Sequence, residues 1–162
     1  MKFTQYVFAK SQAIKACTGS TGDLPDPSLM NPVLLAYIGD AIFTFYTRLK
    51  LLPTSTHVRV LNDLDMKLVS AVYQCQAMEI LAERLTEEEK TIYHRGRNAK
   101  TTVPKSATVH EYRVATAFEA LLGWLYLTER YERLEEFLED AFNIISNKLQ
   151  QETRCLNHDY AG

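Results

Sequence analysis

Apolar residues in this chain recur at intervals of three and four positions, and no stretch alternates apolar with polar residues for long enough to form a strand. The clearest run spans residues 58–81, where its apolar members are Val58, Leu61, Leu64, Leu68, Val72, Cys75, Met78 and Leu81. The spacing predicts a long amphipathic helix, with a break near Asn62 to Asp65. We therefore expect an all-α fold, a compact bundle of six or seven helices.

Local start and stop signals predict the other helices. Asn31 can cap a helix that begins at Pro32, where the missing N–H costs nothing, and Pro53 should stop it near Leu51. Thr86 and Glu89 form a capping box for a shorter helix that ends near Gly96. Two more helices are predicted, from Val109 to Thr128 and from Tyr131 to Gln150. The last has one apolar face and one acidic face, as expected of a helix that covers a core.

A chain of 162 residues with 46% hydrophobic content is long enough for one buried core and short for two domains. We expect residues 1–30 to be an N-terminal extension and linker, residues 31–152 to be the folded domain, and residues 153–162 to be a disordered tail. No export signal or membrane-spanning segment is indicated, so we expect a soluble, cytoplasmic protein. The three cysteines form no CxxC pair, so neither a disulfide framework nor a zinc site is indicated.

The formal net charge of −2 hides an uneven distribution. Residues 90–113 contain six basic residues and one acid, whereas residues 129–152 contain seven acids and three basic residues. The basic segment would attract a polyanion, and the acidic one would repel it. The plain alternative is that both segments are ordinary solvated surface.

Two acids interrupt otherwise apolar helices. Asp40 and Glu119 have no oppositely charged residue three or four positions away, and each lies near a glycine, Gly39 or Gly123. A buried, unpaired carboxylate costs several kcal/mol, and a helical glycine costs about 1 kcal/mol relative to alanine. Glycines are tolerated where two helices, or a helix and a ligand, approach closely. Each acid could instead pair with a distant Arg or Lys, or point to solvent; a shared Mg²⁺ would satisfy both charges together.

Three segments resemble the ribonuclease III superfamily, and Mini-ribonuclease III most closely. They are "LAYIGDAIFTFYTR" at 35–48, "RGRNAKTTVPKSATVHEYRVAT" at 95–116 and "AFEALLGWLYL" at 117–127. The resemblance implies an all-helical endonuclease domain over residues 31–152. It implies a homodimer that hydrolyses double-stranded RNA, with Mg²⁺ at each active site and Asp40 and Glu119 as catalytic, metal-binding carboxylates. The products would carry a free 3′ hydroxyl and a 5′ phosphate. The cellular substrate would be the precursor of large-subunit (23S) ribosomal RNA. A ribosomal protein is a candidate partner that would assist cleavage.

The chain departs from the larger superfamily members at three acidic positions. Their two signature glutamates fall on Val33 and Ala36, and their later aspartate falls on Thr116. With two carboxylates instead of four, we expect weaker Mg²⁺ affinity and a greater dependence on bound RNA to complete the coordination. Thr116 and Tyr37 are candidates to support the metal's ligands. The apolar excess at Phe43, Phe45 and Tyr46 fits a dimer interface together with core.

No separate RNA-binding domain fits within this chain, so the catalytic domain itself would hold the duplex. The candidates lie on the basic segment, where flexible side chains can follow a phosphate backbone; they are Arg95, Arg97, Asn98, Lys100, Thr101 and Lys105. One alternative is a non-catalytic ribonuclease III-like module that binds structured RNA. A second is a helical phosphohydrolase acting on small molecules, which the scattered histidines do not favour.

Overall fold

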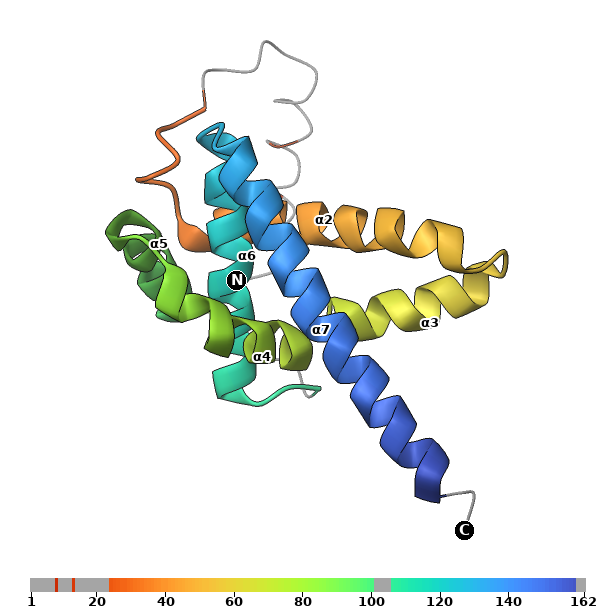
Figure 1. The fold of residues 1–162 in the computed structure, drawn as a ribbon. Helices are drawn as coiled ribbons and strands as arrows, with labels where there is room; N and C mark the ends of the chain where they lie inside the picture. The colour runs from red at the N-terminus through yellow and green to blue at the C-terminus, as the bar shows by residue number, and fades with distance from the viewer. Residues whose placement is uncertain (1–7, 9–12, 14–23, 101–105, 160–162) are drawn as a thin grey trace.

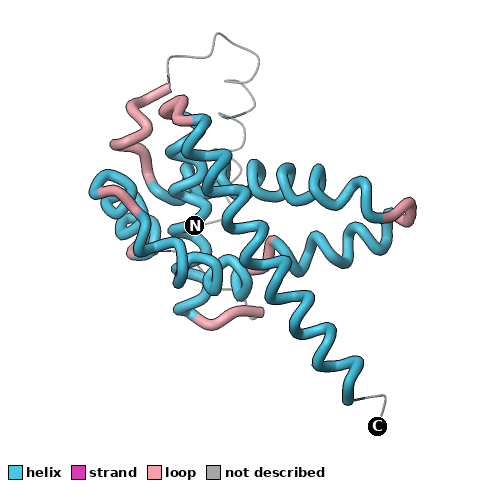
Figure 2. The backbone as a smooth tube through the Cα atoms, in the orientation of Figure 1, coloured by secondary structure: helices cyan, strands magenta, loops and turns pink. Residues whose placement is uncertain are grey.

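The computed structural model describes residues 24–100 and 106–159, together with residues 8 and 13. Within these residues the chain is helical and contains no strand, which confirms the all-α prediction (Figure 2). The α-helices in chain order are α2 (Pro32–Leu51), α3 (Val58–Leu68), α4 (Ala71–Leu81), α5 (Glu87–Arg97), α6 (Val109–Leu127) and α7 (Tyr131–Asp159). Two short 3-10 helices, η1 (Leu52–Thr54) and η2 (Ala82–Arg84), follow α2 and α4. None of the described helices has the length and hydropathy needed to cross a membrane.

Helix α6 is the central element. It is apolar around most of its circumference, and α2, α4 and α5 all pack against it. Its buried residues from Val114 to Leu125 form much of the core. Figure 1 shows α7 crossing in front of α6, while α2 and α3 form a hairpin that extends to one side. Packing against α6 therefore sets the positions of α2, α4 and α5 relative to one another.

Two glycines allow α2 and α6 to cross at close range. A Cβ atom at Gly39 would lie 1.8 Å from the carbonyl oxygen of Glu119, and one at Gly123 would lie 2.0 Å from the carbonyl oxygen of Leu35. Side chains at either position would force the helices apart. The expectation that these glycines mark a close approach is confirmed. Gly39 of α2 faces the backbone of α6, and Gly123 of α6 faces the backbone of α2.

Capping signals set the helix starts as predicted. The Asn31 side chain accepts from the backbone N–H of Val33, with Pro32 as the first helical residue. The Thr86 and Glu89 capping box begins α5. A second capping box, made by Thr108 and Glu111, begins α6.

The predicted break in the 58–81 helix was wrong in position. Residues 62–65 are helical, and the chain bends at Val69 and Ser70 instead. Asp65, expected to weaken the helix, is buried and accepts hydrogen bonds from Thr47 Oγ1 at 2.6 Å and Arg48 Nε at 2.8 Å. These partners on α2 stabilise a polar residue that would otherwise favour solvent.

Helix α7 covers the core through its apolar face, as predicted, with Leu134, Leu138, Ala141 and Ile145 buried. It runs to Asp159, beyond the predicted end at Gln150 and through most of the segment expected to be disordered. Its acidic face also fastens other elements. Glu139 accepts from Lys50 on α2, and Glu136 and Asp140 accept from Arg84 on η2.

Candidate active site

The α2–α6 crossing brings Asp40 and Glu119 to one cavity. The cavity has a volume of about 360 Å³, and its lining residues are Val33, Ala36, Tyr37, Asp40, Tyr112, Thr116 and Glu119. Asp40 follows Gly39 directly, and Glu119 is the residue whose carbonyl oxygen faces Gly39. The glycine contact therefore places the two carboxylates together. Both residues expected to support them, Tyr37 and Thr116, lie in the same wall.

The two acids differ in exposure. Asp40 is exposed to solvent, which agrees with the alternative that this acid points to solvent. It lines the cavity together with Tyr37, which is 76% exposed. Glu119 is the more buried of the pair. The site is thus an open pocket with one carboxylate at its mouth and one deeper in its wall.

Neither carboxylate has a cationic partner among the described residues. Burial raises the pKa of Glu119 to about 8; the charge of Asp40 adds to this rise, and the neighbouring Gln74 side chain offsets part of it. Burial also raises the pKa of Asp40. Two like charges at one site without a counter-ion are unfavourable, so the alternative of a distant Arg or Lys partner finds no support in the described structure.

Gln74 is a site neighbour that sequence reasoning missed. It is fully buried on α4, and its Nε2 donates to the carbonyl oxygen of Val69 at 3.1 Å. Its Oε1 has no hydrogen-bond partner in the described structure. The only sequence signal was a polar residue on a buried helix face. Thr116, by contrast, is satisfied internally, because its hydroxyl donates to the carbonyl oxygen of Tyr112 at 2.9 Å.

The residues present fit a hard divalent cation such as Mg²⁺. They offer two carboxylates that no cation neutralises, in a pocket open enough for the cation to keep several waters. The Gln74 side chain lies within hydrogen-bonding reach of Glu119 and adds a further polar group next to this carboxylate. Carboxylate, amide and water oxygens are the donors that Mg²⁺ prefers.

The predicted RNA-binding residues fall into three groups. Arg97, Asn98 and Lys100 are exposed at the end of α5 and just beyond it. Arg97 and Asn98 also line a cavity of about 490 Å³, together with Val109, His110 and Arg113. Thr101 and Lys105 lie outside the described residues. Arg113 is a further cation at this surface that the sequence interpretation counted as basic but did not single out.

Arg95 is occupied differently. Its guanidinium donates to the backbone carbonyl oxygens of Ser28 and of Met30, the latter at 2.6 Å. Trp124 Nε1 donates to the Ser28 hydroxyl at 3.1 Å. Arg95 and Trp124 therefore hold the segment before α2 against the domain, and two of the five N–H donors of Arg95 serve this contact.

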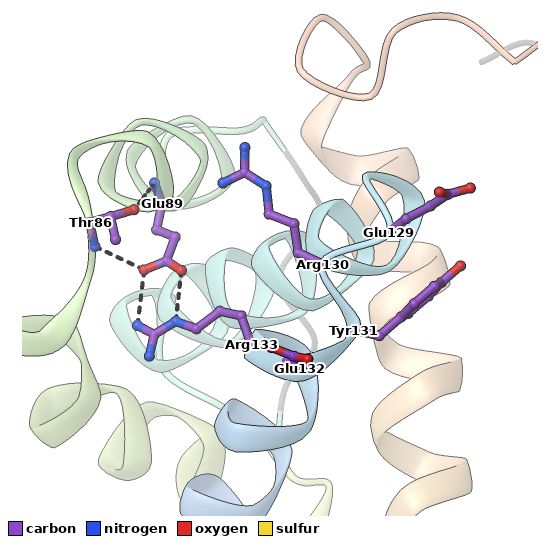
Figure 3. A pocket seen from close by; sticks show the side chains of 7 residues that line it. All are labelled: Thr86, Glu89, Glu129, Arg130, Tyr131, Glu132 and Arg133. Carbon is purple, nitrogen blue, oxygen red and sulfur yellow. Dashed lines mark hydrogen bonds and ion pairs between the residues drawn. The ribbon is translucent and has the colours of Figure 1, made fainter.

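A third cavity, of about 620 Å³, lies where α5 meets the start of α7. Figure 3 shows Arg133 extended toward the carboxylate of Glu89, which also accepts from the backbone of Thr86. The Glu89–Arg133 pair is joined at 2.9 and 3.1 Å, and Arg130 pairs with Glu88 at 2.7 Å. These charges neutralise one another, so the cavity is a structural joint between helices.

Comparison with known proteins agrees with this architecture. The family model of the ribonuclease III domain matches residues 34–130. Mini-ribonuclease 3 of Enterococcus faecalis is 46% identical over 117 residues, which cover 70% of this chain and 89% of the relative. The protein of the same name from Thermoanaerobacter sp. is 42% identical over 118 residues, covering 72% of this chain and 83% of the relative.

A solved structure is also similar. The crystal structure of protein FN1578 from Fusobacterium nucleatum superposes with a TM-score of 0.65 at 34% identity, covering 67% of this chain and 90% of that one. The family model spans more than half of the chain, and both relatives match more than two thirds of it. The chain therefore belongs to the ribonuclease III family, within its Mini-ribonuclease 3 group, and is an endoribonuclease.

Proposed function

We propose that the chain is a Mg²⁺-dependent endoribonuclease that hydrolyses phosphodiester bonds in double-stranded RNA and leaves a free 3′ hydroxyl and a 5′ phosphate. The observation that carries the proposal is the open pocket in which Asp40 and Glu119 lie together without a cationic partner in the described structure. Such an arrangement is unfavourable for folding alone and suits a site completed by a ligand.

In this proposal Asp40 and Glu119 are the residues that would hold Mg²⁺. When bound, the ion polarises the scissile phosphate and lowers the pKa of the attacking water. Glu119 must give up its proton to act as a ligand, because its pKa of about 8 keeps it largely protonated at neutral pH before the ion binds. Asp40, at the pocket mouth, is placed to meet the ion first.

Thr116 and Tyr37 support the site in different ways. Thr116 is buried and bound to the α6 backbone, so it shapes the wall next to Glu119 and contributes no charge. Tyr37 is exposed beside Asp40, one turn earlier on α2, where its ring and hydroxyl can contact a bound substrate. Because Val33 and Ala36 stand where larger relatives have glutamates, the pocket lacks those two further carboxylates.

The exposed cations at the α5 end support duplex RNA as the substrate. Arg97, Lys100 and Arg113 are exposed, and Asn98 adds a hydrogen-bonding side chain. Double-stranded RNA is recognised mainly by its shape and by contacts to phosphates and ribose hydroxyls, which such side chains can make. We assign Arg95 to anchoring residues 28–30 in place of the RNA contact expected from the sequence.

An exposed apolar surface on α2 supports a homodimer. Leu34, Tyr37, Phe45, Leu49 and Leu52 are exposed and follow helical spacing along one side of the α2–η1 segment. Phe43 belongs entirely to the core, where its ring packs edge-to-face on Phe118, and Tyr46 is half-buried against α7. Of the three aromatics assigned jointly to interface and core, Phe45 is thus the one free to contact a second copy. A two-fold dimer would present two pockets to the two strands of a duplex.

The finer parts of the proposal concern the cellular substrate. We propose that it is a base-paired stem in the precursor of large-subunit (23S) ribosomal RNA, processed in the cytoplasm, with a ribosomal protein as a helper that exposes the stem. The names of the similar proteins support the assignment as a ribonuclease, but they do not state a substrate.

The deciding experiment is cleavage of a long RNA duplex by the full chain over a wide range of Mg²⁺ concentrations. Products are mapped at both ends, and binding is measured in parallel on the same duplex. We expect Mg²⁺-dependent cutting of both strands with 5′-phosphate ends. Binding without cutting at any Mg²⁺ concentration would contradict the proposal and favour the non-catalytic RNA-binding module.

A further inference from the structure

The fold brings together three different metal-ligating side chains away from the candidate active site. Cys75 and Glu79 lie one turn apart on α4, and His110 lies in the first turn of α6. The ligand atoms of the three residues all lie within 4.8 Å of one another. None of the three lines the pocket that contains Asp40 and Glu119.

We propose that Cys75, Glu79 and His110 form a binding site for a borderline-soft divalent metal ion, with Zn²⁺ as the fitting ion. Thiolate, imidazole and carboxylate are its preferred donors, at metal–ligand distances of about 2.0 to 2.3 Å. Ligand atoms in such a tetrahedron lie roughly 3.4 to 3.6 Å apart. Mg²⁺ does not compete, because it selects oxygen donors and disfavours a thiolate.

Local structure fixes the backbone that carries the three donors. Cys75 is buried on the face of α4 that packs against α6, and Glu79 follows it at the i,i+4 spacing that puts both on one side of the helix. The capping box formed by Thr108 and Glu111 fixes the backbone around His110. Glu79 and His110 are exposed, so their side chains have room to rotate toward the Cys75 sulfur.

The charges around the site set the conditions for binding. Burial raises the pKa of the Cys75 thiol, the charges of Glu79 and Glu111 add to the rise, and those of Arg97 and Lys148 oppose it. The thiol is therefore protonated before the ion arrives, and binding releases one proton. Three protein ligands leave a fourth position for water, as in zinc sites that are not closed by the protein.

A bound ion would connect two parts of the fold. It would join α4 to the start of α6, the helix that carries Glu119. His110 also lines the cavity with Arg97, Asn98 and Arg113, so the ion would add positive charge beside the cations proposed to hold RNA. The inference stands on the three side chains themselves and does not depend on the proposed cleavage activity.

The test is titration of the full, tag-free chain with Zn²⁺ after treatment with a chelator, followed by calorimetry. We expect one equivalent per chain in the wild type. Glu79→Gln and His110→Ala should each weaken binding at least tenfold, because even changes next to a metal's ligands typically weaken affinity 10- to 100-fold. Both residues are exposed, so these variants should fold normally. At a hundredfold excess of Zn²⁺ over its Kd, the melting temperature should rise by roughly 5 °C.

Two further arms separate this site from others. Co²⁺ replaces Zn²⁺ as a probe, and its thiolate charge-transfer absorption should disappear in Cys75→Ser and persist in the matched control Cys155→Ser. Asp40→Asn and Glu119→Gln should leave Zn²⁺ binding unchanged. Zn²⁺ affinity that is the same in wild type, Glu79→Gln and His110→Ala, or the absence of the thiolate absorption in the wild type, would overturn the proposal.

Discussion

Glu89 and Glu119 are two glutamates withdrawn from solvent, and they have opposite electrostatics. Glu89 is 2% exposed, and burial alone would raise its pKa, but hydrogen bonds from Arg133 and from the Thr86 backbone outweigh burial and hold the pKa below its ordinary value. Glu119 has no cation beside it, and burial with the charge of Asp40 raises its pKa to about 8. The same residue type is neutralised in one place and left unneutralised in the other.

The difference distinguishes a structural joint from a site that we propose is completed by a ligand. At the α5–α7 joint, the arginine fork and the capping box complete the carboxylate's hydrogen bonds within the protein. At the α2–α6 crossing, the protein supplies two carboxylates, with the Gln74 side chain of α4 near Glu119, but no cationic partner for either carboxylate within the described structure. An unfavourable arrangement that persists in a folded protein is best explained by function.

The largest expected effect is on catalysis. Asp40→Asn and Glu119→Gln should each lower the cleavage rate on duplex RNA at least a thousandfold, equivalent to about 4 kcal/mol of transition-state stabilisation. Both lose a negatively charged metal ligand while their shape is kept. Glu89→Gln, the matched control at the joint, should keep the rate per folded molecule within about twofold. Cutting within tenfold of wild type by either site variant at saturating Mg²⁺ would contradict the assignment.

The glycine crossing is expected to have the next largest effect, on stability. Gly39→Ala should lower the free energy of unfolding by about 3 kcal/mol or more, because the new Cβ would lie 1.8 Å from a backbone oxygen that cannot move without displacing α6. Chemical denaturation measures this directly. The control Asn147→Ala, at an exposed position of α7, should change stability by less than about 0.5 kcal/mol. Equal stabilities for the two variants would show that the helices can separate at little cost.

The two glutamates should respond with opposite signs when neutralised. In the metal-free protein, the folded-state pKa of Glu119 lies above its ordinary value of 4.5, so the folded state binds more protons than the unfolded state between pH 4.5 and 8. The contribution of Glu119 to the free energy of unfolding therefore decreases as the pH rises from 4.5 to 8. Glu119→Gln should therefore stabilise the metal-free protein by up to about 4 kcal/mol at pH 8 and by much less at pH 5.

Glu89 should behave in the reverse way. Its folded-state pKa is lowered, so its stabilising contribution is present above pH 4.5 and is lost as pH falls below that value. Glu89→Gln should destabilise the protein by roughly 2 kcal/mol at pH 8, because it leaves Arg133 without its charged partner. Denaturation of both variants at pH 5 and pH 8 tests the pair together. A Glu119→Gln variant less stable than wild type at pH 8 would show that its carboxylate is neutralised within the protein.

The smallest expected effect distinguishes two arginines on α5. Joint Arg97→Ala and Lys100→Ala should weaken duplex binding about tenfold and reduce the slope of log affinity against log salt by about 2. Arg95→Ala should lower stability and leave that slope unchanged, since its guanidinium binds backbone carbonyl oxygens. Binding measured at several salt concentrations separates the two. A reduced slope for the single variant Arg95→Ala would show that Arg95 binds RNA after all.

Signals that act over one or two helical turns made much of the fold predictable. The Asn31 cap, the Thr86 and Glu89 capping box and the three- and four-residue apolar spacing set helix starts and buried faces close to where the structure has them. The glycines next to two unpartnered acids also predicted a close approach correctly. These features depend on neighbours in the chain, so the sequence contains them.

Contacts between residues distant in the chain were decided by packing alone. Asp65 keeps its helix intact because Thr47 and Arg48 reach it from α2, and Arg95 is turned to residues 28–30 by the docking of that segment. The exposure of Asp40, the placement of Gln74 beside Glu119 and the meeting of Cys75 with His110 likewise require α2, α4 and α6 to be assembled. Periodicity determines which face of a helix is buried, whereas the partner of a polar group on that face depends on how the helices cross.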